Sequence, residues 1–327
     1  MFNKTSIILS IILYILIFFL RFEQGGWEVN VDLFPQIRQS LDHRIAQFLP
    51  SPQAELLSGI LLGQNKNLPG KLKLALRDTS TLHIVVASGQ NLSLVAGFFL
   101  SLSGLIGRKK ATALGLLASV FYTLMSGMQL PILRAAIMFS LASLASFFGR
   151  EREGFWVLIT TAGLMLLINP SWIANLSFQL SFLATFGVIV ISPILLKFFS
   201  KIPIISQDLA VTLAAQLMVT PVIAQNFHQI SLVSLITNVL ILWTVSFIMI
   251  LGSIMLFVGT IWTNAGLVIG LGVNVLLTYF IYIVSFFASL PFAWEYIGEQ
   301  IWIVWVGYYL IIASVMLILN NDQTTNN

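Results

Sequence analysis

The sequence contains no cysteine and very few charged residues, and both shortages restrict what the protein can be. Without cysteine, the chain can form no disulfide and can use no thiol chemistry. Charged residues make up 9% of the 327 residues, whereas soluble domains contain about 25%. Hydrophobic residues reach 58%, and the mean hydropathy is +0.95. This composition predicts an all-α fold, a polytopic helical membrane protein.

The few titratable side chains do not form the constellations that catalysis or metal binding requires. The histidines His43, His83 and His228 lie far apart and show no metal-ligand spacing. No acidic pair lies within a predicted span, because Glu295 and Glu299 fall in a predicted outer loop. The sequence also lacks a Gly-x-Ser-x-Gly nucleophile elbow and a Gly-x-x-x-x-Gly-Lys phosphate loop. We therefore expect no enzyme activity, catalytic residue, metal or cofactor.

Long apolar segments predict about ten transmembrane helices, each close to the ~20 residues that a bilayer requires. The predicted spans are residues 6–20, 82–106, 111–125, 130–148, 155–168, 173–196, 209–225, 232–258, 264–290 and 301–319. We interpret residues 1–20 as an uncleaved N-terminal membrane anchor, because the sequence after Leu20 is a poor signal-peptide cleavage site. The polar residues 320–327 predict a disordered tail.

Residues 21–81 form the only sizeable polar region, with seven Lys/Arg and six Asp/Glu. Two short helices with an apolar face are predicted near 51–77, a pattern typical of helices that lie along the membrane interface. The second helix carries Lys71, Lys73 and Arg77 on its polar side. These residues either form a solvated face that attracts lipid headgroups or receive the phosphates of an entering nucleic acid.

The charge of the short connections predicts the orientation of the helices. One set of connections is basic, and the opposite set, near 126–129, 169–172, 226–231 and 291–300, has no Lys or Arg. The basic residues are Arg108, Lys109, Lys110, Arg150, Arg152, Lys197 and Lys201. Because short basic loops remain in the cytoplasm, we expect both termini to be cytoplasmic and residues 21–81 to be extracytoplasmic.

A polar interruption at residues 88–91, Ser-Gly-Gln-Asn, lies inside an apolar segment and predicts a broken helix. A backbone break at membrane depth is tolerated where it is buried in protein or lines a water-filled cavity. Discontinuous helices of this kind mark binding sites in many transporters. The alternative is a tight helix–helix contact, in which Ser88 and Gly89 let two backbones approach.

The segment containing this break resembles the signature of the ComEC competence family. The similarity is carried by residues 83–97, His-Ile-Val-Val-Ala-Ser-Gly-Gln-Asn-Leu-Ser-Leu-Val-Ala-Gly, and by the preceding stretch 61–79. Pro-Ile-Leu-Arg-Ala at 131–135 and Phe-Gln-Leu-Ser-Phe at 178–182 resemble two further blocks of that family, in the same order. The family commonly has histidine where this chain has Asn91. The resemblance implies that residues 82–319 form a competence-type transmembrane channel domain.

The resemblance also nominates the residues of a substrate path. These are His83, Ser88, Gly89, Gln90, Asn91, Arg134 and Gln179. For Arg134 the competing interpretation is an anchor at the helix end that reaches the lipid headgroups. For Gln179 it is a hydrogen bond between helices, worth about 0.6 kcal/mol on average.

ComEC proteins form the channel through which transforming DNA enters bacteria as a single strand, so the resemblance implies DNA uptake across the cell membrane. The expected partners are single-stranded DNA, membrane lipids, and a separate DNA receptor, nuclease and cytoplasmic motor, with a homo-oligomer as a further possibility. We expect only the membrane module, without the outer OB-type and C-terminal metallo-β-lactamase-like domains that many members add. The alternative is a secondary transporter, or a protein that handles lipid or envelope polymers with the same fold.

Overall fold

The computed structural model describes residues 4–23, 25, 32–64, 66–85, 88–149, 153–199 and 206–324. Almost all of these residues lie in helices, as predicted. The first part of the chain forms α1 (Lys4–Glu23), α2 (Pro35–Phe48), α3 (Gln53–Leu62), α4 (Gly70–Asp78) and α5 (Leu82–Val85). The next part forms α6 (Gly89–Ser101), α7 (Ser103–Ile106), α8 (Arg108–Met125), α9 (Leu130–Phe147) and α10 (Gly154–Ile168).

The second half of the chain is also helical, apart from one pair of short strands. It contains a 3₁₀ turn η1 (Pro170–Ala174), then α11 (Leu176–Phe186), a π-helical turn η2 (Gly187–Ile191), α12 (Ser192–Phe199) and α13 (Ser206–Phe227). The strands β1 (Gln229–Ser231) and β2 (Trp294–Tyr296) pair antiparallel, with Ile230 opposite Glu295. Between them lies the hairpin of α14 (Ser234–Ile261) and α15 (Thr263–Ala288), and α16 (Trp302–Thr324) follows. The strands therefore join two of the connections that lack Lys and Arg.

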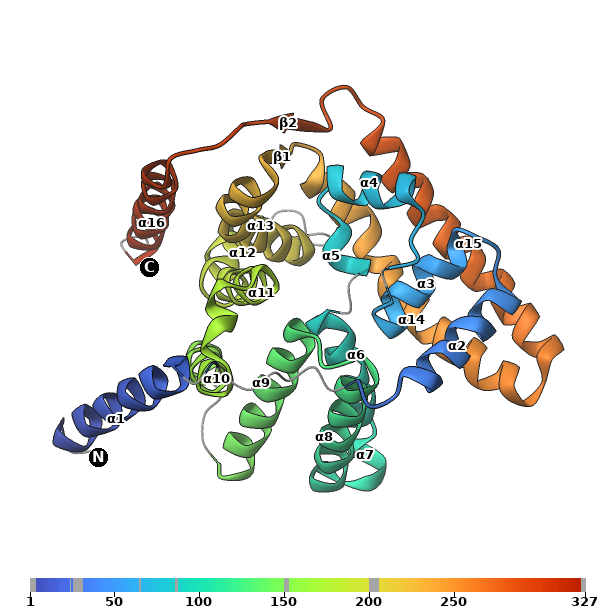
Figure 1. Ribbon diagram of the computed structural model, residues 1–327, viewed down its shortest axis with the longest axis horizontal. Coiled ribbons are helices and arrows are strands. Elements are labelled where there is room, and N and C mark those ends of the chain that lie inside the picture. The colour runs from blue at the N-terminus through green and yellow to red at the C-terminus, as the bar shows by residue number, and fades with distance from the viewer. Residues whose placement is uncertain are drawn as a thin grey trace.

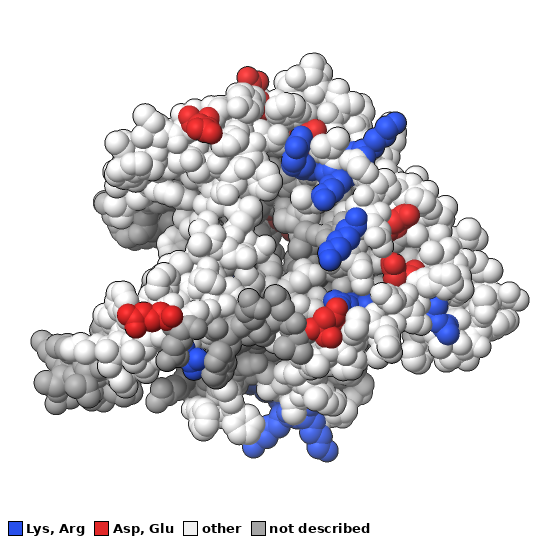
Figure 2. Space-filling view, in the orientation of Figure 1, with Lys and Arg blue, Asp and Glu red and all other residues white. Residues whose placement is uncertain are grey.

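The helices have the length and composition of a membrane protein. Within the described residues, seven helices are long and apolar enough to cross a membrane. They are Gly89–Ile106, Leu130–Phe147, Leu176–Phe199, Ser206–Phe227, Ser234–Ile261, Thr263–Ala288 and Trp302–Leu319. The other three predicted spans are occupied by α1, α8 and the shorter α10. Figure 2 shows that most of the visible surface carries neither Lys/Arg nor Asp/Glu, and the chain is a polytopic all-α membrane protein.

Sequence signals explain several helix ends. Pro35 and Pro131 lie in the first turns of α2 and α9, where a missing N–H costs no helical hydrogen bond. Gly63 terminates α3 in the left-handed conformation, with φ of +71°. At the start of α11, the side chain of Asn175 accepts a hydrogen bond of 2.9 Å from the backbone N–H of Ser177.

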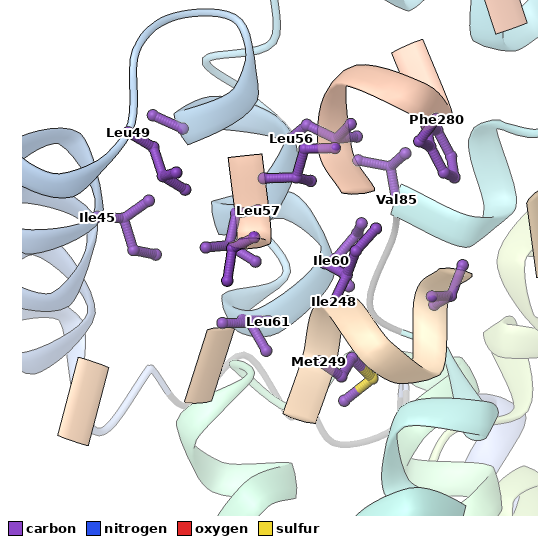
Figure 3. Close-up of a cluster of buried hydrophobic side chains, with 14 of the residues drawn as sticks. Ile45, Leu49, Leu56, Leu57, Ile60, Leu61, Val85, Ile248, Met249 and Phe280 are labelled. Atoms are coloured by element: carbon purple, nitrogen blue, oxygen red, sulfur yellow. The ribbon is translucent and has the colours of Figure 1, made fainter. Parts of the chain in front are cut away.

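The main core lies on one side of the molecule, where α2, α3, α4 and α5 pack against the α14–α15 hairpin (Figure 1). Figure 3 shows side chains from these helices pointing toward one another, including Ile45, Leu56, Ile60 and Phe280. All four are completely buried. The region predicted as a separate extracytoplasmic segment is therefore integral to the largest packed cluster.

Of the two predicted interfacial helices, α4 has the expected pattern and α3 does not. In α4, Leu72 and Leu76 are buried while Lys71 and Lys73 are exposed. In α3, every residue except Gln53 and Glu55 is buried, because its apolar and small residues surround the whole helix instead of one face. Thus α3 is an internal helix of the core rather than a surface helix.

Two end points differ from prediction. α16 continues to Thr324, so residues 320–324, predicted to be disordered, are helical, while 325–327 lie outside the described residues. The helix break falls before Gly89 rather than across 88–91: Ser88 is extended, and α6 begins at Gly89. Residues 86–87 lie outside the described residues.

Candidate functional site

The structure contains a cavity of about 840 Å³. Its lining residues come mainly from α5, α6, α9, α10, α11, η2, α13 and α14, and Figure 1 shows how these elements are arranged. Its wall combines apolar side chains with a small number of polar and charged ones. Such a composition is typical of ligand sites, in which a few polar groups fix the orientation of what is bound.

Gly89 and Arg134 meet at the wall of this cavity. A Cβ atom at residue 89 would lie 2.7 Å from Nη2 of Arg134 and 3.2 Å from the Cβ of Ala135. The absence of a side chain at Gly89 therefore lets the guanidinium pass over the first turn of α6. Gly89 is needed for this close approach, and its φ is not in the left-handed region.

Arg134 is held by hydroxyl groups of α11. Its Nε donates to Oγ of Ser181 at 2.7 Å, and its Nη1 donates to Oγ1 of Thr185. The same nitrogen lies 3.5 Å from Sδ of Met138. Among the described residues, no carboxylate forms an ion pair with Arg134. The guanidinium is thus positioned by neutral partners and keeps its positive charge available to an anion in the cavity.

This contact unites the three sequence blocks that carry the family resemblance. Gly89 comes from the first block, Arg134 from the second and Ser181 from the third. They are separated by 45 and 47 positions in the chain, yet they form one continuous set of contacts. Their meeting beside a cavity indicates that the blocks define one site.

Three other predicted path residues also line the cavity. Gln90 follows Gly89 on α6 and is exposed, and its side chain forms no hydrogen bond with a described residue. His83 on α5 lines the cavity while its Nδ1 lies 2.9 Å from the carbonyl oxygen of Ser80. Ser88 lies at the entry to α6 and donates to Oδ1 of Asn91 at 3.2 Å. The cavity therefore has hydrogen-bonding groups close to its cation.

Asn91 does not line the cavity, contrary to its assignment to the substrate path. Its side chain is completely buried, and its Nδ2 donates to the carbonyl oxygen of Ile60 at 2.7 Å. Ile60 lies in the last turn of α3, where carbonyl groups have no partner within the helix. Asn91 therefore ties α6 to the end of α3.

Side chains from two other elements cap the same helix end. The hydroxyl of Tyr122, on α8, lies 3.4 Å from the carbonyl oxygen of Leu61. Nε2 of Gln129, just before α9, donates to the carbonyl oxygen of Gly63 at 3.1 Å. Asn91 and Gln129 thus connect the core around α3 to α6 and to the start of α9, which line the cavity, and Tyr122 connects it to α8.

Gln179 also lies apart from the cavity. It sits in the first turns of α11, and its Nε2 donates to the carbonyl oxygen of Ile173 in η1 at 2.9 Å. This bond satisfies a backbone group of the preceding turn. The third sequence block reaches the site through Ser181 instead, two residues further along.

The basic residues of α4 form a group on the molecular surface. Figure 2 shows Lys and Arg side chains gathered on the face over α4. Lys71 and Lys73 are exposed, whereas Arg77 forms an ion pair of 3.1 Å with Asp78. The two lysines, rather than Arg77, are therefore the residues of α4 whose charge is unpaired among the described residues.

Several cavity residues were missed by the sequence reasoning. They are Thr185 on α11, Asp208 and Thr212 on α13, and Trp243 and Ser246 on α14. The i, i+4 spacing of Asp208 and Thr212, and of Ser181 and Thr185, places each pair on one helix face. That spacing was the available signal, but it does not reveal which neighbour the face meets. Across the described residues, no group of three or more metal-ligating side chains could hold a metal ion.

The fold and the cavity define a helical membrane protein with an internal, partly polar site whose wall contains one guanidinium and one carboxylate. A family model described as Competence protein matches residues 60–322, and the chain belongs to that family. No solved structure matches it.

Three curated relatives show the range of similarity. ComE operon protein 3 of Bacillus subtilis (strain 168) is 27% identical over 208 residues, covering 63% of this chain and 26% of that protein. Uncharacterized protein YcaI of Escherichia coli (strain K12) is 28% identical over 244 residues, covering 68% and 31%. An uncharacterized protein of Aquifex aeolicus (strain VF5) is 30% identical over 168 residues, covering 50% and 40%. The aligned region thus spans between about a quarter and two fifths of these relatives.

Proposed function

We propose that this chain forms a path by which single-stranded DNA crosses the cell membrane during competence. The observation that carries the proposal is Arg134, a guanidinium without a carboxylate partner among the described residues, at the wall of an internal cavity. A path for a polyanion requires such a cationic group, together with polar groups that replace water. Membership of the Competence protein family supports this choice of anion.

The extent of the cavity also supports a path. On α9 its lining residues run from Arg134 to Ala142, a rise of about 12 Å along the helix. The lining also includes Gln90 near the start of α6 and Asp208 in the first turn of α13. In the predicted orientation, the start of α6 is extracytoplasmic and the start of α13 is cytoplasmic. The cavity would then extend toward both membrane surfaces.

The orientation is part of the proposal and has its own test. We propose a multi-pass protein of the cell membrane with cytoplasmic N- and C-termini. A reporter fused after Gly107 or Gly149 should then be cytoplasmic, and one inserted near Gln53 should be extracytoplasmic, because short basic loops remain inside. Accessibility of each reporter to a membrane-impermeant reagent measures this. An external signal from the Gly107 fusion would contradict the orientation.

The proposed path needs partners for its other steps. We propose that a DNA receptor, a nuclease and a cytoplasmic motor are separate proteins, and that this chain transfers the strand without catalysing a reaction. Lys71 and Lys73 on α4 would receive the strand before it reaches His83, since α4 contacts α5 directly. Membrane lipids surround the helices, and assembly of several copies is a further part of the proposal.

A second function is favoured by the size and charge of the same cavity. A volume of about 840 Å³ lies within the range typical of sites for small ligands, ~300–1,000 Å³. Asp208 also places a carboxylate in the wall, which repels phosphate. The volume favours a secondary transporter for a small polar or anionic substrate, or a protein that handles lipid or envelope polymers, and the carboxylate disfavours a polyanion.

Substitution of Arg134 tests the proposal. A naturally competent host lacking its own copy would be complemented with wild type, Arg134→Gln or Arg108→Gln, at matched membrane levels. Arg108 is an exposed control whose Nη2 lies 3.5 Å from Ser146. We expect Arg134→Gln to lower uptake of labelled DNA by at least about tenfold, on the scale of one charge-assisted contact, and Arg108→Gln to leave it unchanged. Equal uptake by wild type and Arg134→Gln would contradict the DNA path and leave the small-substrate function.

A further inference from the structure

Trp243 is the largest aromatic side chain in the cavity wall. It lies on α14 and is 49% exposed, although the next two residues, Thr244 and Val245, are almost completely buried. The helix therefore has one face in the core and places the indole on the other. α14 therefore belongs both to the main core and to the wall of the cavity.

The indole is held in position by two other aromatic rings. Its centroid lies 5.7 Å from that of Tyr279 and 6.1 Å from that of Phe247. The hydroxyl of Tyr279 donates to the carbonyl oxygen of Leu240 at 3.2 Å, which fixes the ring against α14. Trp243 is thus supported from the protein side, and a supported ring loses little conformational entropy when a ligand stacks on it.

The indole N–H has no hydrogen-bond partner among the described residues. By contrast, Trp305 donates through its Nε1 to Oε1 of Gln225 at 2.9 Å. Trp243 therefore presents both an aromatic surface and an unused donor to the cavity that contains Arg134.

We propose that Trp243 is a stacking platform for a nucleobase of a single strand whose phosphate binds Arg134. This inference rests on the proposed function and names the part of the substrate that the cavity recognises. Proteins that bind single strands without sequence preference combine cationic groups for the backbone with aromatic side chains for the bases. The cavity contains both kinds of group, with Arg134 on α9 and Trp243 on α14. A base presents a π face on which the indole can stack, whereas an acyl chain or a bare phosphate has no such face.

The test compares two probes that differ only in their bases. The purified full chain in nanodiscs would be titrated with fluorescent oligothymidylate and with a phosphodiester oligomer of equal length that carries no bases. We expect wild type to bind the oligothymidylate about 5- to 150-fold more tightly, the range for stacking one base. Trp243→Leu should bind both probes equally, at the level of the oligomer without bases, and Trp243→Phe should retain most of the preference.

A matched control is Trp262→Leu, because Trp262 is 64% exposed just beyond the end of α14 and does not line the cavity. It should keep the wild-type preference. If wild type binds both probes equally, base stacking is contradicted while the DNA path stands. If wild type binds neither probe, the DNA path and the stacking role are both contradicted. A preference that survives in Trp243→Leu also overturns the inference.

Discussion

Gln90 and Asn91 are consecutive in the chain, yet they belong to two regions with opposite properties. Asn91 is completely buried and bonded to the end of α3, at the edge of the main core. Gln90 is exposed in the cavity and has no hydrogen-bond partner among the described residues. The first turn of α6 thus carries both a group that holds the structure together and one that is available to a ligand.

The helix α14 shows the same division along its length. Ile241, Val245 and Ile248 face the core and are almost completely buried. Trp243 and Ser246, in alternation with them, face the cavity. Asn91, Tyr122 and Gln129 at the core junction are paired with backbone carbonyl groups, whereas Gln90 and Trp243 in the cavity wall form no hydrogen bond with described residues. The cavity can remain open because α14, which forms part of its wall, is packed against the main core on its other face.

The largest loss of stability is expected where α14 and α15 contact each other through Gly259 and Gly266. A Cβ at Gly266 would lie 2.7 Å from Cα of Gly259 and 2.9 Å from the ring of Phe48, so leucine there must displace backbone. We expect Gly266→Leu to destabilise the protein by about 3 kcal/mol, as overpacking does, and to reduce the monodisperse fraction in detergent. Gly272→Leu, on the same helix with no atom within 4 Å of its Cβ position, should behave as wild type. Equal thermal stability of both variants would show that this contact is not part of the core.

The second-largest effect is expected at Asn91, and it should distinguish this residue from its neighbour Gln90 on α6. Asn91→Leu leaves the Ile60 carbonyl without its donor and should lower the free energy of unfolding by ~1–3 kcal/mol. Gln90→Leu removes no hydrogen bond with a described residue and should leave stability unchanged while it lowers DNA uptake. Asn91→His should be nearly silent, because an imidazole N–H can donate to the same carbonyl. Thermal unfolding and uptake would be measured on each variant, and a stability loss in Gln90→Leu equal to that of Asn91→Leu would remove the distinction.

The sequence predicted the helical class well and the site only in part. Apolar segments produce a strong local signal, and helices occupy all ten predicted spans. Within the described residues, seven helices are long and apolar enough to cross a membrane. The three family blocks pointed to Gly89 and Arg134, which do meet at the cavity. Local sequence patterns could not predict the hydrogen bond of Asn91, because its acceptor is the backbone carbonyl of Ile60, 31 residues earlier in the chain.

The burial of α3 and the place of Trp243 in the cavity wall could not be predicted from the sequence, for related reasons. An apolar decapeptide has the same composition whether it lies on a lipid surface or inside a core, and only the contacts with Gly252 and its neighbours decide. Trp243 is one of eight tryptophans in a membrane protein, where aromatic residues are common at interfaces. Its place in a cavity depends on the packing of α14 against α13 and α15.

A smaller effect is expected from a change that keeps the charge in the cavity and alters only its geometry. Arg134→Lys retains a cation but loses the planar group that donates to both Ser181 and Thr185. We expect DNA uptake to fall about fivefold, the equivalent of one net hydrogen bond of ~1 kcal/mol. Arg134→Gln, which removes the charge, should reduce uptake further at the same membrane level. If the lysine and glutamine variants are equally impaired, geometry rather than charge determines the contribution of this residue.

The smallest effect should come from the surface, where charge acts through solvent. Lys71 and Lys73 are exposed on α4, and the double substitution Lys71→Gln/Lys73→Gln leaves its buried Leu72 and Leu76 unchanged. If both lysines contact phosphates, the slope of log K against log salt for a single-stranded oligonucleotide should decrease by about 1.4, since each contact contributes ~0.7. Affinity should fall at low salt and converge with wild type at high salt, because screening removes the contribution of exposed charges.

The charge-matched control Lys109→Gln/Lys110→Gln alters the basic start of α8, on the opposite predicted side of the membrane, and should keep the wild-type slope in nanodiscs. An unchanged slope in the α4 variant would assign its lysines to lipid headgroups, and entry of the strand would then depend on the cavity residues alone.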